Sequence, residues 1–306
     1  MCSGRTVPAE GPPILRLPAY AKVNLGLEIL GRRADGFHEI VSVTQIVSLA
    51  DTVEVTTSDT LSIEMDPPLV GEGDNLAGTA ALALASDTGR APTAAVRIVK
   101  RIPLAAGLGG GSSDAAATLR LLDRLWGTSL GTARLTRIAA ALGSDVPLFL
   151  GGGLSLVRGR GEIVAPLKST APYALLLMYP GGAPPDKTRA LYEALSPGDF
   201  GDGSATRSLG DWLRACRSVQ EAALVNGFDA AADRVYPGFA GLRAELAGLL
   251  GRPVHLSGAG PTLFALFDRS GTARTAAEQV RRPGLITFVA RSVARRPPIR
   301  APRSRE

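Results

Sequence analysis

The chain has 306 residues, of which 45% are hydrophobic and 20% charged, with a net charge of +6, as in a globular protein long enough for two domains. No apolar run approaches the ~20 residues of a membrane helix, and the first thirteen residues lack the charged-then-apolar order of a signal peptide, so we expect a cytoplasmic protein without a membrane partner. Two cysteines (Cys2 and Cys216) and two histidines (His38 and His255), far apart in the chain, argue against a disulfide framework and a zinc site.

In the N-terminal half, apolar and β-branched runs alternate with segments of helical spacing. Residues 1–13 are rich in Gly and Pro, and we expect them to be flexible. Strands are predicted over 14–30, as one strand or as a pair interrupted at Pro18, and over 36–47, 52–55 and 94–102. Helices are predicted over 75–86, 113–126 and 135–142.

The most informative segment joins the strand at 94–102 to the helix at 113–126. Residues 103–118 read PLAAGLGGGSSDAAAT, with Gly107 and Gly109 to Gly111 followed by Ser112 and Ser113. Glycines let the backbone come close to a phosphate, and the first N–H groups of a helix, together with its dipole, attract an anion. The serines add hydroxyls for a phosphate oxygen or a magnesium ion. The segment therefore predicts a binding loop for a nucleotide triphosphate.

Two better-known nucleotide loops do not fit this segment. The chain contains no Gly-Lys pair, which the P-loop requires. The dinucleotide pattern G-x-G-x-x-G/A also fails, because its last position falls on Ser112 or Asp114. The plainer alternative is a glycine-rich turn beside a closely packed helix of small residues, for which three consecutive glycines are a costly choice.

After Gly153, short strands lead into the C-terminal half. We predict strands there over 174–179, 253–256, 262–267 and 285–293, the middle two paired around a glycine turn, and helices over 187–195 and 239–250. The Gly-rich, basic segment 198–210 is predicted to be a loop. Strands mixed with helices in both halves indicate an α+β fold of two domains, over 14–167 and 168–296, before a basic flexible tail over 297–306.

Five blocks of the chain together resemble the GHMP kinases. They are AKVNL at 21–25, GRRADGFHE at 31–39, the glycine loop, LGSDVP at 142–147 and LSGAGPT at 256–262. The first two blocks are typical of one branch of this family, whose substrate is a cytidyl diphosphate ester of methylerythritol. The resemblance implies an N-terminal domain similar to the second domain of ribosomal protein S5, a ferredoxin-like C-terminal domain, and an active site in the cleft between them.

The resemblance also implies a reaction, the transfer of phosphate from ATP to the 2-hydroxyl of the cytidyl ester with Mg²⁺ as cofactor. It implies that Mg²⁺ is bound by Ser112 or Ser113. The residues implied for ATP binding are Pro103, Leu104, Ala105, Ala106, Gly107, Leu108, Gly109, Gly110, Gly111, Ser112 and Ser113.

Two further residues are implied as catalytic. Asp145 would take the proton from the hydroxyl that attacks the γ-phosphate, although a carboxylate after a helix end is also a common capping residue. Lys22 would lie beside it. Only four of the 34 basic residues are lysines, so a lysine in a strand is notable, although a lysine at a strand edge can simply extend into solvent. For a loose phosphoryl-transfer transition state, most of the rate must come from positioning and electrostatics.

Substrate binding is implied for residues in three blocks. Phe37 and, in the other domain, Tyr192 would stack on the cytosine. The family often has tyrosine at the position of Phe37. Without the resemblance, Phe37 would be interpreted as a core aromatic and His38 as a turn residue. Block 226–229 departs from the family pattern, so no role is assigned to it. The full set implied for the substrate is Asn24, Phe37, His38, Tyr192, Gly258, Gly260 and Thr262.

The basic charge and the fold leave three rival functions. RNA binding is disfavoured, because part of the excess of basic residues lies among prolines in the tail, and no basic face with interspersed aromatic residues is evident. A homoserine or mevalonate type of kinase would give no reason for block 36–39, GFHE. A catalytically dead nucleotide-binding regulator would not need both Lys22 and Asp145. We expect a small-molecule kinase, monomeric or weakly dimeric, without a nucleic-acid partner.

Overall fold

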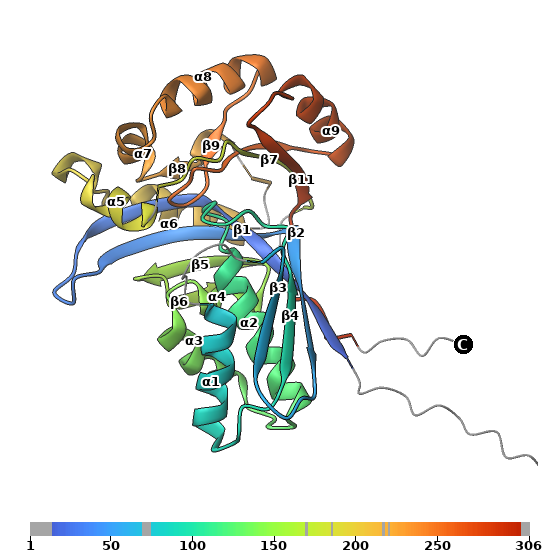
Figure 1. Ribbon diagram of the computed structural model, residues 1–306. Helices are drawn as coiled ribbons and strands as arrows, with labels where there is room; N and C mark the ends of the chain where they lie inside the picture. The colour runs from blue at the N-terminus through green and yellow to red at the C-terminus, as the bar shows by residue number, and fades with distance from the viewer. Residues whose placement is uncertain are drawn as a thin grey trace, which may run out of the picture.

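The computed structural model describes residues 14–68, 75–168, 171–184, 186–215, 218–219 and 221–300. The segments 1–13 and 301–306, which the sequence predicts to be flexible, lie outside the described residues. The chain forms two sheets with helices packed on them, so the predicted α+β architecture is confirmed (Figure 1).

The first sheet is built on two long antiparallel strands, β1 (Leu15–Arg32) and β2 (His38–Thr56). The sequence predicted two strands in place of β2. The structure joins them because a β-bulge takes up the irregular stretch opposite Tyr20 and Ala21. Pro18 does not interrupt β1, since β8 (Val225–Asn226) pairs with β1 only further along and leaves it near the sheet edge there.

The strand order of this sheet is β3-β4-β2-β1-β8, and β5 and β6 extend it from β2. The added strands are β3 (Ser62–Asp66), β4 (Ala95–Val99), β5 (Leu154–Gly159) and β6 (Ile163–Pro166). Four helices pack beside this sheet and close one core with β1, β2 and β4 (Figure 1). They are α1 (Leu76–Thr88), α2 (Gly110–Leu125), α3 (Thr132–Leu142) and α4 (Val146–Gly151).

The second sheet is antiparallel, in the order β11-β7-β10-β9. Its strands are β7 (Ala174–Tyr179), β9 (His255–Leu256), β10 (Leu263–Phe267) and β11 (Ile286–Arg291). The C-terminal half also contains four helices, α5 (Lys187–Glu193), α7 (Asp229–Val235), α8 (Phe239–Leu250) and α9 (Ser270–Gln279). The short helix η2 (Glu221–Ala223) precedes α7. A third cluster of buried side chains from both sheets, among them Val23, Val43, Leu177 and Phe264, joins the two halves.

Segment 198–210 is not a loop, contrary to the prediction from its glycines. After the short turn η1 (Pro197–Asp199), helix α6 runs over Ser204–Arg214 and packs on β1 and β2. The carboxylate of Glu28 on β1 accepts hydrogen bonds from the backbone N–H groups of Gly203 and Thr206, at 3.1 and 2.7 Å. A distant strand therefore supplies the N-terminal cap of α6, which local sequence cannot reveal.

The chain returns to the first sheet after β11. Val293 N–H bonds to the Ile46 carbonyl, and Arg16 and Arg300 exchange backbone hydrogen bonds. Residues 297–300, the beginning of the predicted flexible tail, therefore lie along β1. None of the helices in the described residues is both long and apolar enough to cross a membrane.

Candidate active site

The glycine loop follows β4 and ends in α2, as predicted, but α2 begins at Gly110 and not at 113. Gly109 is the N-cap, in the left-handed conformation at φ 73°. Gly110 and Gly111 therefore form the first helical turn. Their backbone N–H groups belong to the unpaired donors of a helix start, which favour an anion.

Two glycines of the loop are required by close packing. A Cβ on Gly107 (φ +81°) would lie 2.5 Å from the Ser257 carbonyl and 2.8 Å from the Gly260 carbonyl. A Cβ on Gly109 would lie 2.7 Å from the Phe149 ring and 3.1 Å from Lys22. The loop is thus held between α4 on one side and a turn of the C-terminal half on the other, with no space for a side chain.

Lys100, Asp51 and Asp114 form a buried ion network beside the loop, which the sequence did not suggest. Lys100 Nζ lies 2.5 Å from Asp51 and 2.6 Å from Asp114 in the second turn of α2. Asp51 also accepts the backbone N–H groups of Arg101 and Ile102, at 2.5 and 2.8 Å. Burial, only partly opposed by Lys100, raises the pKa of Asp114 to about 7. The network fixes both ends of the loop, on β2 and on α2.

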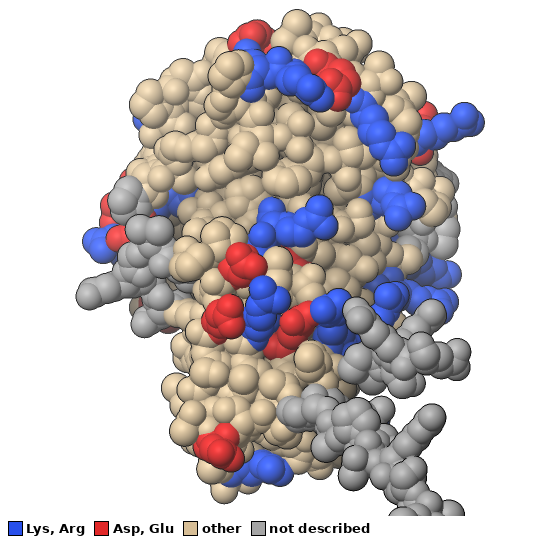
Figure 2. Space-filling view, turned by 45° about the vertical axis from the view of Figure 1, so that its right-hand side comes forward, with Lys and Arg blue, Asp and Glu red and all other residues tan. Residues whose placement is uncertain are grey.

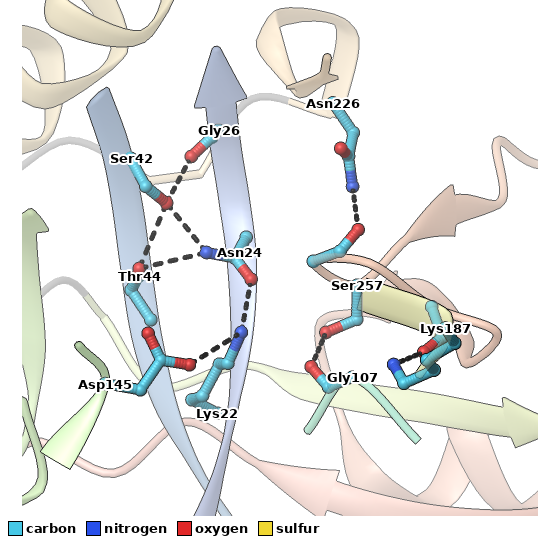
Figure 3. A network of polar contacts seen from close by, with 12 residues as sticks. Lys22, Asn24, Gly26, Ser42, Thr44, Gly107, Asp145, Lys187, Asn226 and Ser257 are labelled. Carbon is cyan, nitrogen blue, oxygen red and sulfur yellow. Dashed lines mark hydrogen bonds and ion pairs between the residues drawn. The ribbon is translucent and has the colours of Figure 1, made fainter. Parts of the chain in front are cut away.

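Lys22 and Asp145 meet at the mouth of the loop, as the resemblance implied (Figure 3). Lys22 Nζ lies 3.7 Å from Asp145 and donates to Asn24 Oδ1 at 2.8 Å. Asn24 in turn donates to Ser42 and Thr44 of β2, at 2.8 and 3.3 Å. The side chain of Lys22 is only 8% exposed and that of Asp145 is 42% exposed, so a buried, oriented ammonium faces an accessible carboxylate.

The predicted glycine turn between β9 and β10 packs directly against the loop. Asn226, in the block to which no role was assigned, donates to the carbonyls of Leu256 and Gly258 at 2.9 and 3.0 Å and so fixes this turn (Figure 3). Gly258 lies in the cleft, but Gly260 and Thr262 do not line it. Thr262 is fully buried behind the turn, so its implied contact with substrate is not supported.

Aromatic side chains gather at the other end of the cleft. The His38 and Tyr192 rings stack with centroids 4.5 Å apart, and Phe200 lies 6.3 Å from His38. Phe37 is 48% exposed, with the Arg160 guanidinium 4.7 Å above its ring. Both expected aromatics therefore line the cleft, and the His38 ring is stacked on one face of Tyr192.

A single cleft of about 1810 Å³ contains most of the predicted site. It is lined by Lys22, Asn24, Asp145, Gly258, the three residues Phe37, His38 and Tyr192, and the loop residues from Pro103 to Ser112 apart from Leu108. Leu108, which precedes the helix, is 1% exposed and belongs to the core between the two halves. Ser113 is 2% exposed and faces away from the cleft, since adjacent positions in a helix face different directions. Ser112 is therefore the serine that can reach a metal ion.

Sequence reasoning missed two of the lysines that line the cleft. Lys22, Lys100 and Lys187 all line it, while Lys168 is exposed elsewhere. The scarcity of lysine, used above for Lys22, is a signal that would have found the other two. Within the described residues no group of three His, Cys, Asp or Glu side chains could hold a metal ion. Mg²⁺ does not need such a group, because it is commonly held by one or two protein ligands, substrate phosphates and water.

Comparisons with known proteins identify the family of the chain. Residues 75–153 match the GHMP kinases N terminal domain and residues 205–285 the GHMP kinases C terminal domain. The chain is 39% identical over 262 residues to a 4-diphosphocytidyl-2-C-methyl-D-erythritol kinase of Dehalococcoides mccartyi, covering 85% of this chain and 92% of that one. It is 38% identical over 287 residues to the Gloeobacter violaceus kinase of the same name, covering 91% and 94%.

Solved structures of GHMP-type kinases are also similar to this chain. A crystal structure of 4-(cytidine 5'-diphospho)-2C-methyl-D-erythritol kinase matches with a TM-score of 0.74 and 34% identity, over 91% of this chain and all of that one. A homoserine kinase from Cytophaga hutchinsonii matches with a TM-score of 0.69 but 17% identity, over 97% of this chain and all of that one. The second likeness establishes the fold alone.

Proposed function

The chain belongs to the GHMP kinases, and within them to the 4-diphosphocytidyl-2-C-methyl-D-erythritol kinases, and from this premise we propose how its cleft works. The γ-phosphate of ATP passes to the 2-hydroxyl of 4-diphosphocytidyl-2-C-methyl-D-erythritol, which gives the 2-phosphate and ADP in the methylerythritol phosphate pathway. The observation that carries the proposal is the approach of Lys22 and Asp145, 3.7 Å apart, beside the glycine loop.

In this mechanism Asp145 accepts the proton of the 2-hydroxyl as its oxygen bonds to the γ-phosphorus and the bond to the β,γ-bridging oxygen breaks. Lys22, beside the carboxylate, stabilises negative charge on the attacking oxygen and the phosphate. Asn24, itself held by Ser42 and Thr44, fixes the Lys22 ammonium in place. Catalysis then rests on positioning and on preorganised charge, as expected for phosphoryl transfer.

The loop holds the triphosphate through the backbone N–H groups at the start of α2. Ser112, in the first turn of α2 and on the wall of the cleft, fits as the protein ligand for Mg²⁺. When bound, Mg²⁺ neutralises charge on the β- and γ-phosphates. The other loop residues on the cleft wall border the same space, and Gly107 and Gly109 let the loop pack closely on the glycine turn and on Phe149 behind it.

The aromatic end of the cleft fits the cytidine. We place the cytosine ring on Phe37, where a stacked base gains about 1–3 kcal/mol, and assign its hydrogen bonds to His38. In this arrangement the His38 ring, stacked on Tyr192 with the centroids 4.5 Å apart, lies beside the base.

The same proposal includes the location of the enzyme, its assembly and its binding partners. We place the enzyme in the cytoplasm, as a monomer or weak homodimer that binds neither nucleic acid nor membrane. On the face drawn in Figure 2, basic side chains lie among acidic ones and do not form one broad basic surface, which supports a small-molecule enzyme over an RNA-binding protein.

The test is ATP-dependent ADP release with 4-diphosphocytidyl-2-C-methyl-D-erythritol, homoserine and mevalonate offered in parallel. We expect turnover of the cytidyl ester alone. Turnover of another alcohol would refute the assignment of Phe37 and His38, and ATP binding without turnover of any substrate would favour the regulator.

A further inference from the structure

Lys187 is the first residue of α5 and has no role in the mechanism derived so far. It is 7% exposed, yet it lines the cleft. Its Nζ donates a hydrogen bond to the Gly260 carbonyl, in the glycine turn that packs on the loop (Figure 3).

The position of Lys187 is tied to the transfer centre through that turn. A Cβ on Gly258 would lie 3.0 Å from Lys22 Nζ, and a Cβ on Gly107 would lie 2.8 Å from the Gly260 carbonyl that Lys187 binds. The charges of Lys22 and Asp145 both act on Lys187. Two ammonium groups, one from each half of the molecule, therefore border the same stretch of the glycine loop.

The charge of Lys187 lacks a counter-ion. Lys100, equally enclosed, has two carboxylates within 2.6 Å. Among the described residues, Lys187 has one neutral carbonyl as its partner and no carboxylate within 4.0 Å. Burial, reinforced by Lys22, lowers the pKa of Lys187 to about 7. A buried charge without a partner is costly, and an anion from the cleft would remove that cost.

We propose that Lys187 is a second phosphate-binding ammonium, which contacts the transferred phosphoryl group from the side of the C-terminal half. The ligand chemistry is a phosphate oxygen. The shared turn with Lys22 and Gly107 assigns that oxygen to the γ-phosphate of ATP, in preference to the diphosphate of the cytidyl ester. The reaction in which Lys187 takes part follows from the proposed function, whereas its phosphate ligand follows from the geometry of the loop.

The kinetic test compares Lys187→Met and Lys187→Arg with the unaltered enzyme, and uses Lys168→Met, an exposed lysine outside the cleft, as control. We expect Lys187→Met to lower kcat by about 10²–10³, with KM for ATP and for the cytidyl ester changed less than about threefold. Lys187→Arg should recover part of kcat, since it restores the cation. Loss confined to KM of either substrate, or no rescue by arginine at equal thermal stability, would overturn the proposal.

A second measurement uses the unaltered protein and needs no acceptor substrate. Trinitrobenzenesulfonate modifies accessible amines, and mass spectrometry reads modification at Lys187. We expect the β,γ-imido analogue of ATP to protect Lys187 clearly better than ADP does. Equal protection would overturn the γ-phosphate contact. Because this result does not depend on the acceptor, it separates a failure of the Lys187 assignment from a failure of the proposed function.

Discussion

The two ends of the cleft are built in different ways. At the phosphate end, the side chains of Lys22 and Lys100 are each 8% exposed, and hydrogen bonds and ion pairs hold both of them in place beside the loop. At the aromatic end, Phe37 is half exposed and Arg160 and His38 contact the rings that a base would need. The phosphate end is preorganised and should control turnover. The aromatic end, where Phe37 is open to the cleft, should control affinity for the cytidyl ester.

The strongest test of the phosphate end is Asp145→Asn. Asparagine keeps the shape but cannot accept the proton, so we expect kcat to fall by about 10²–10⁴ while ATP binding changes little. Steady-state kinetics with both substrates and direct ATP titration measure the two effects. A variant with full kcat and weakened substrate binding would remove Asp145 from the role of base.

The rigidity of the same end can be tested with Gly107→Ala. The new methyl group would meet backbone atoms at 2.5–2.9 Å at a positive φ, which demands that the loop or the glycine turn move. We expect a loss of about 2–4 kcal/mol in the free energy of unfolding and loss of ATP binding. Gly248→Ala on α8, where no atom lies within 4 Å, is the control and should be neutral or stabilising. Unchanged ATP affinity in Gly107→Ala would mean that the loop is softer than its packing implies.

Phe37→Ala addresses the aromatic end. Loss of the stacking face should weaken binding of the cytidyl ester by about 1–3 kcal/mol, seen mainly in its KM, with kcat and KM for ATP retained. Phe37→Tyr keeps the stacking face and should behave like the unaltered enzyme. If Phe37→Ala changes ATP affinity instead, the two ends of the cleft have been assigned the wrong way round.

The smallest expected effect is on the pH dependence of stability, through Asp114 in the buried ion network with Lys100 and Asp51. Asp114 has its pKa raised by burial to about 7, so the folded state binds a proton that the unfolded chain releases above pH ~4. Stability from this group is therefore greatest at low pH and falls as pH rises through about 7, by roughly 1 kcal/mol between pH 6 and pH 8. Asp114→Asn does not titrate, so its unfolding free energy should lack this decline. Parallel pH profiles for both proteins would contradict the assignment.

The sequence alone determined the parts of the site that lie within one local segment. The strand, glycine loop and helix around 94–126 follow from periodicity and from glycine chemistry, both of which act over a few residues. Lys22, Asp145 and the family were also identified from contiguous blocks, and the relatives confirm the family. Strand β7 and helix α8 have the bounds that were predicted.

Only the tertiary structure decided how distant segments complete one another. Helix α6 needs the carboxylate of Glu28 as its cap, Asp114 needs Lys100 from the segment after β4, and Lys187 meets the Gly260 carbonyl 73 positions away. Ser112 was separated from Ser113 only by the direction in which α2 packs. Local sequence fixes backbone preferences over a few residues, but the burial and pairing of a charge depend on which remote groups the folded chain brings against it.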